Sequence, residues 1–200
     1  MKKIKILIIS LFALVSGSSA FAQGGFYTNL GYDVSFPMEG TKDFISPTSF
    51  RGFTFSGGYF LNDNLALELR WSWHVFYDAI PFDVYESGTR AISGKQYRSI
   101  NAFPLTFGGK YFFGTSAMRP YVGFGIGPYK IRKRTEMGIY YVEDRQWHFG
   151  LTPEIGFIYN LSTGVGVMAN VRYDHMFEAG NIDSQGNISL SIGFIFSGGY

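Results

Sequence analysis

The sequence predicts an all-β protein, an eight-stranded antiparallel up-and-down transmembrane β-barrel. Large apolar side chains recur at every second position through most of the chain, which is the period of a β-strand. The segments with this period are joined by connections that are alternately short and long. The chain also begins like a secretory signal peptide, so the barrel is expected to form outside the cytoplasm.

Residues 1–22 form the predicted signal peptide. A basic start precedes the apolar segment Ile6–Val15, which is too short to span a bilayer as a helix. Small residues follow and end in Ala20-Phe21-Ala22, an A-x-A cleavage site. The mature domain is then the barrel, residues 23–200.

The composition narrows the class of protein. Loss of Lys2, Lys3 and Lys5 with the signal peptide leaves 14 basic against 15 acidic residues, a net charge of −1, so we expect no nucleic-acid partner. Aromatic residues make up 19% of the chain and charged residues only 16%, against about 25% charged in soluble domains. Since no mature segment is apolar enough for a spanning helix, such a chain crosses a membrane only as a closed barrel.

Alternation identifies eight strands. In Leu65–Val75 the odd positions are large and apolar, whereas the even positions include Glu68, Arg70 and His74. The predicted strands are Phe26–Phe36, Arg51–Leu61, Leu65–Val75, Ile100–Phe113, Pro120–Ile131, Trp147–Tyr159, Val165–Phe177 and Asn187–Phe196.

The connections between these strands have two lengths. Three are short turns rich in Asn, Gly and Ser: 62–64, 114–118 and 160–164. Four are expected to be long polar loops: Pro37–Thr48, Tyr77–Tyr97, Arg132–Arg145 and Glu178–Gly186. An even strand count with short turns at one end and long loops at the other is the layout of outer-membrane barrels.

The apolar face is expected to meet lipid and the face of small and charged residues to fill the lumen. A soluble barrel would have the reverse arrangement, but eight strands enclose too little room for so many Phe, Tyr and Trp side chains. A lipid-facing Arg or Lys at mid-bilayer would also cost about 2–4 kcal/mol. Aromatics near the short turns fit an interfacial girdle: Tyr59, Phe60, Tyr111, Phe112, Phe113 and Tyr159. We expect a paired charge network in the lumen, formed by Glu68, Arg70, Lys110, Glu154 and Arg172.

Four segments carry a family resemblance: Gly58–Glu68, Phe103–Phe113, Arg119–Gly127 and Thr152–Gly156. With them the mature chain resembles the small outer-membrane β-barrels of the OmpA-barrel and OmpX kind, a porin-family outer membrane protein β-barrel domain. The resemblance implies the outer membrane of a Gram-negative bacterium and insertion by the barrel assembly machinery. It also implies a monomer among outer-membrane lipid and lipopolysaccharide. Such barrels usually end on an aromatic residue, and here either Phe196 or Tyr200 fits.

The chain shows few catalytic sequence patterns. Lipid A deacylases of similar fold use a His-x-Ser pair, and none of His74, His148 and His175 is followed by a serine two positions later. A scattered triad, for instance His148 with a serine and Asp174, stays open as an alternative. The chain has no cysteine and no H-E-x-x-H, so we expect no catalytic residue, no cofactor site and no metal site.

One basic cluster and its hairpin are candidates for surface contacts. The cluster contacts lipopolysaccharide phosphates or is a solvated tip balanced by nearby carboxylates; it consists of Lys130, Arg132, Lys133 and Arg134. Tyr140, Tyr141 and Trp147 on the same hairpin are the best candidates for a protein partner.

The sequence therefore predicts a non-enzymatic outer-membrane barrel with a plugged polar lumen. Its expected role is structural, or is a surface interaction through the long loops. The first alternative is a narrow channel for small or hydrophobic solutes, and the second is a barrel enzyme that modifies lipid A.

Overall fold

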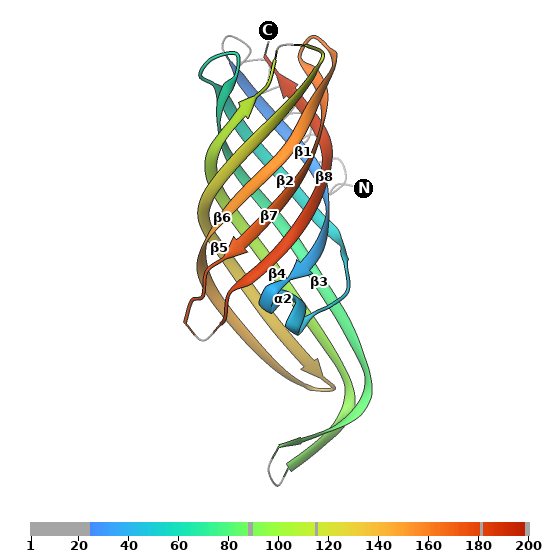
Figure 1. Ribbon diagram of the computed structural model, residues 1–200. Helices are drawn as coiled ribbons and strands as arrows, with labels where there is room; N and C mark the ends of the chain where they lie inside the picture. The colour runs from blue at the N-terminus through green and yellow to red at the C-terminus, as the bar shows by residue number, and fades with distance from the viewer. Residues whose placement is uncertain (1–24, 88–89, 115, 181, 199–200) are drawn as a thin grey trace, which may run out of the picture.

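Eight antiparallel strands close into one barrel in the computed structural model, which describes residues 25–87, 90–114, 116–180 and 182–198 (Figure 1). Each strand pairs with the next in sequence, and the last pairs with the first. The predicted fold class is therefore confirmed. The strands are β1 (Phe26–Met38), β2 (Ser49–Phe60), β3 (Leu65–Ser87), β4 (Arg90–Phe112), β5 (Met118–Met137), β6 (Tyr140–Ser162), β7 (Val165–Met176) and β8 (Gln185–Ser197).

The two faces of the barrel wall are distributed as the alternation predicts. On β3, Leu67 and Leu69 are exposed on the outside, whereas Glu68 and Arg70 are buried inside the ring. The predicted aromatic girdle is wrong at two positions, because Phe60 and Phe112 point inward and are buried. Each lies one position out of phase with the exposed aromatics Tyr59 and Tyr111, so strand parity rather than aromatic character decides its face.

The short turns lie together at one end of the barrel, the short-turn end, and the long connections lie at the other end (Figure 1). In the short turns after β4 and β6, Gly114 and Gly164 take positive φ angles of 73° and 84°, a backbone conformation that favours glycine.

Two of the predicted long loops are wrong. Most of Tyr77–Tyr97 and Arg132–Arg145 is strand: β3 with β4, and β5 with β6, continue as ribbons past the barrel (Figure 1). The two ribbons also pair with each other as far as Gln96 and Met137, which makes a four-stranded sheet. The period of two fades there because much of this sheet projects past the ring of strands with both faces exposed, so no face has to be apolar.

The connection between β1 and β2 contains a short helix, α2 (Glu39–Phe44), in place of the predicted loop. It lies at the end with the long connections (Figure 1). In the described part of the chain, no helix has both the length and the apolar character that a membrane span requires. The predicted signal peptide and Tyr200 lie outside the described residues, and Phe196 lies within β8, which ends at Ser197.

Candidate functional site

The barrel interior is the first candidate site, and its side chains form four layers. Strand β3 shows their order from the short-turn end: Ala66, then Glu68 and Arg70, then His74, then Phe76. The first layer is apolar and aromatic and consists of Tyr27, Phe60, Ala66, Phe112, Tyr121, Ile158, Met168 and Ile195. The last layer is also apolar and consists of Ile45, Phe76, Ile100, Tyr129, Ile131 and Met176. Two charged layers lie between them. We call the one nearer the short-turn end the lower charged layer and the one nearer the long connections the upper charged layer.

Four of the five predicted network residues form the lower charged layer. A guanidinium nitrogen of Arg70 lies 2.6 Å from a carboxylate oxygen of Glu68 and 2.6 Å from one of Glu154. Lys110 Nζ lies 2.6 Å from Glu68 and 3.4 Å from Glu154. Two cations and two carboxylates thus form a buried quartet with no net charge, an arrangement that lowers the cost of burying charge.

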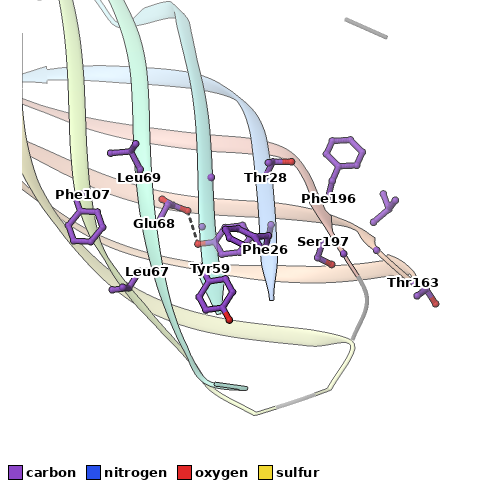
Figure 2. Close-up of a pocket in the computed structure, with 16 residues that line it drawn as sticks. Phe26, Thr28, Tyr59, Leu67, Glu68, Leu69, Phe107, Thr163, Phe196 and Ser197 are labelled. Atoms are coloured by element: carbon purple, nitrogen blue, oxygen red, sulfur yellow. Dashed lines mark hydrogen bonds between the residues drawn. The ribbon is translucent and has the colours of Figure 1, made fainter. Parts of the chain in front are cut away.

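Glu68 is the hub of this quartet. Besides the two cations, it accepts a hydrogen bond of 3.0 Å from the hydroxyl of Tyr27, the dashed line that ends at Glu68 in Figure 2. Glu154 is less well supported, because its Oε2 accepts no hydrogen bond from the described residues. The two carboxylates therefore contribute unequally to the same cluster.

Arg172, the fifth predicted residue, does not join the quartet. Its Cα is the cross-strand partner of Glu154, but its guanidinium lies 3.0 Å from Asp33 and 3.4 Å from Asp174. His74 completes this upper charged layer, with Nδ1 3.9 Å from Asp33.

Asp33 and His74 were not predicted from the sequence to join a charge network, although strand parity places both inside the barrel. Asp33 also accepts hydrogen bonds from Thr54 and Ser191, and Asn187 donates to Asp174 at 3.1 Å. Small hydroxyl and amide side chains on β2 and β8 thus hold the carboxylates of β1 and β7 in the upper layer. Inward positions with an Asp or Asn on β1, β7 and β8, namely Asp33, Asp174 and Asn187, were the signal that could have identified it.

Helix α2 and the residue after it cover the inner wall at the end with the long connections. Ile45 is fully buried in the last apolar layer, and its amide donates to the carbonyl of Thr41 at 2.9 Å. Arg98 donates to the carbonyl of Phe44 at 3.3 Å, which ties the helix to β4. At the start of the helix, Glu39 has a positive φ of 48° and its carboxylate lies 2.9 Å from Nδ1 of His175.

The histidines lie in three separate places. His74 is in the upper charged layer, with Nδ1 3.0 Å from the hydroxyl of Ser35. His148 lies with Nδ1 2.8 Å from the carbonyl oxygen of Phe177, and His175 contacts Glu39. Within the described residues, no hydrogen bond joins His148 to Asp174, the pair considered for a scattered triad, and Asp174 is bound by Arg172 instead.

Alternation along β5 divides the predicted basic cluster between two faces. Arg132 and Arg134 face outward, and their guanidinium nitrogens lie 2.6 and 3.9 Å from a carboxylate oxygen of Glu143. The hydrogen bond from Arg132 lowers the pKa of Glu143 and burial raises it, and the net result is a pKa below the ordinary value. Lys130 lies over the ring of Trp147 at 5.6 Å. Lys133 instead points toward Phe44, 5.4 Å from the ring centre, where burial lowers its pKa. The cluster is therefore not one uniform cationic patch.

The sheet beyond the barrel is the second candidate site. Strand β6 pairs with β7 only from Gly150 onward, so in the described chain no strand covers the free edge of Tyr140–Trp147. The tip is apolar and exposed: Ile139 is 88% exposed, Tyr140 67% and Val142 68%. An open strand edge next to an exposed apolar tip is a typical arrangement of a binding surface.

Comparisons with known proteins agree with this architecture. The family model described as outer membrane protein beta-barrel domain matches residues 7–196. The fold is similar to the crystal structure of Neisserial surface protein A, with a TM-score of 0.60, 21% identity, and coverage of 87% of this chain and 97% of that one. It is also similar to Ail, the attachment invasion locus protein of Yersinia pestis, with a TM-score of 0.52, 13% identity and coverage of 87% and 100%. No curated protein matches the sequence.

Proposed function

The chain belongs to the outer membrane protein β-barrel domain family, and from this premise we propose that it is a non-enzymatic barrel, closed to solutes, whose protruding sheet binds a protein partner. The protein resides in the outer membrane, as its family and its structural neighbours do. The end with the long connections is then the extracellular one, because outer-membrane barrels have short turns on the periplasmic side. The four-stranded sheet stands outside the cell in this orientation.

The layered interior supports a closed lumen. A permeating ion would have to cross two apolar layers and displace the quartet of Glu68, Arg70, Lys110 and Glu154. Eight strands enclose a space that side chains can fill. The quartet then serves the stability of the barrel rather than conduction.

The open edge of β6 is the single observation that carries the proposed surface interaction. The amide of Phe177 donates to the carbonyl of Phe149 at 2.9 Å, so the backbone of Phe149 is directed away from β5. Every second residue before it, including Trp147, Arg145 and Glu143, presents its N–H and C=O to the same side. An extended segment of a partner can pair with this row of groups, and the exposed tip adds apolar contact.

The opposite edge of the sheet is less suited to such pairing. On β3 the register shifts between Ile80 and Asp83, and Pro81 lies within the shift. A proline and an irregularity are features that prevent strand addition at sheet edges. The partner is therefore expected at β6.

Two variants at one position test strand addition. Arg145→Pro removes an amide on the open side, whereas Arg145→Ala removes only the side chain. Lipid vesicles carrying each refolded variant are passed over immobilised serum and extracellular-matrix proteins, and heat-modifiable migration verifies folding. We expect binding by the native protein and by Arg145→Ala, and loss of binding with Arg145→Pro. Equal binding by both variants, or none above protein-free vesicles, contradicts the proposal.

A further inference from the structure

A hollow on the outer wall of the barrel is lined by side chains that take part in neither the closed lumen nor the protruding sheet. It has a volume of ≈ 420 Å³ and lies across the first four strands, toward the extracellular end. Its walls combine aromatic and aliphatic side chains with one cation and one amide: Tyr32, Arg51, Gly52, Phe53, Trp73, Val75 and Asn101.

A β-bulge shapes the extracellular rim of this hollow. Between the pairs Asp33–Gly52 and Ser35–Ser49, β2 contains one residue more than β1. As a result Phe50 and Arg51 are both exposed on the outside, although they are neighbours in sequence. Bulges commonly re-aim side chains in this way. Phe50 and Arg51 thus both project outward at the extracellular rim.

Arg51 is free to bind an anion. Among the described residues no Asp or Glu forms an ion pair with it, and its guanidinium lies 5.8 Å from the centre of the Tyr77 ring. This sets it apart from Arg132 and Arg134, which have Glu143 beside them. An unpaired guanidinium next to aromatic rings, on a surface that meets the membrane, is suited to a phosphate at the lipid headgroup level.

The walls of the hollow are held in place by their own contacts. Trp73 donates its indole N–H to Asn101 at 3.2 Å and stacks on Phe103 with ring centres 5.9 Å apart. The hydroxyl of Tyr32 donates to the carbonyl of Phe50. The apolar surface between Phe53 and Trp73 is therefore already ordered without a ligand. Binding of an acyl chain then costs little conformational entropy in these side chains.

We propose that this hollow binds a phosphorylated, acylated lipid of the outer leaflet, with the phosphate on Arg51 and an acyl chain along Phe53 and Trp73. The ligand is a lipid because the hollow opens outward from the barrel wall, and it is anionic because the hollow offers an unpaired guanidinium. A second hollow, of ≈ 680 Å³ at the periplasmic end, gives the contrast (Figure 2). The described residues that line it include aromatic and aliphatic side chains such as Phe26, but no Lys or Arg, so it offers room for a chain without a site for a phosphate.

The fluorescence of Trp73 provides the test. In a background of Trp71→Phe and Trp147→Phe, Trp73 is the remaining tryptophan. Detergent-solubilised, folded protein is titrated with brominated-acyl lipid A that keeps both phosphates, with the same lipid after dephosphorylation, and with inorganic phosphate as a competitor. We expect saturable quenching by the phosphorylated lipid, about tenfold weaker binding after dephosphorylation, and no displacement by millimolar phosphate.

Two arginine variants decide the role of the guanidinium. Arg51→Gln is expected to weaken binding of the phosphorylated lipid about tenfold and to leave the dephosphorylated lipid unchanged. Arg145→Gln removes an outward arginine that is paired with Glu143, and serves as the matched control, which should behave as the parent. Equal affinity for both lipids, an equal loss in both variants, or displacement by free phosphate overturns the proposal. Heat-modifiable migration confirms that each variant is folded.

Discussion

Replacement of Glu68 by glutamine tests the proposed role of the buried quartet. The substitution keeps the size of the side chain but leaves Arg70 and Lys110 with Glu154 as their remaining carboxylate. Removal of one partner from a buried ion pair costs about 3–5 kcal/mol, and we expect Glu68→Gln to lower the free energy of unfolding by this amount. Glu154→Gln should cost about 1.5–3 kcal/mol less, because Glu154 lacks the short contact to Lys110 and the hydrogen bond from Tyr27 that Glu68 has.

The assay is equilibrium unfolding by urea from lipid vesicles, followed by tryptophan fluorescence. A double variant, Glu68→Gln with Lys110→Met, restores a neutral cluster and should recover part of the loss, which a double-mutant cycle measures as a coupling energy. The reasoning fails if Glu68→Gln changes the free energy of unfolding by less than about 0.5 kcal/mol. It also fails if Glu154→Gln is the more damaging substitution.

Three further predictions concern a glycine in the barrel wall, the residue that anchors α2, and the β5–β6 ribbon. Gly123→Ala places a Cβ 2.7 Å from the carboxylate of Glu154 and should cost about 1–3 kcal/mol in urea unfolding, whereas Gly125→Ala meets its nearest atom at 3.5 Å and should cost clearly less. Ile45→Ala should lower stability by about 2–5 kcal/mol and speed amide hydrogen exchange in α2; unchanged exchange would show that Ile45 does not hold the helix. Because hydrogen bonds lower the pKa of Glu143, its contribution to the β5–β6 ribbon is present above the ordinary pKa and is lost as the pH falls through the lowered one. Ribbon amides should therefore exchange faster, relative to the intrinsic rate, at about pH 3 than at about pH 6, and Glu143→Gln should abolish this difference.

The strands within the barrel could be predicted because two different environments act on them. In Leu65–Val75 one face meets the outside of the barrel and the other meets its interior, so the alternation is clear in the sequence and in the structure. The strand beyond Tyr77 was missed because that difference ends there. Polar and apolar residues then alternate irregularly, and the sequence pattern is that of a loop.

The candidate sites could be predicted only where strand neighbours decide them. Glu68 and Lys110 lie on adjacent strands, and their pairing follows from that order. Arg172 on β7 is paired with Asp33 on β1, two strands away around the ring and 139 residues away in the sequence. The choice between Asp33 and Glu154 depends on side-chain direction rather than on register. Arg51 could not be identified from the sequence as a binding residue. A single arginine becomes a candidate for binding only when the bulge and the hollow beside it are known.

Single-channel conductance in planar bilayers tests the closed lumen most directly. The native protein, folded by the criterion of heat-modifiable migration, is measured beside a variant in which Glu68 and Arg70 are both alanine. We predict that the native protein shows no channel events, because four side-chain layers occupy its interior. Steady, reproducible conductance of the native protein would contradict the closed lumen and would favour a narrow channel.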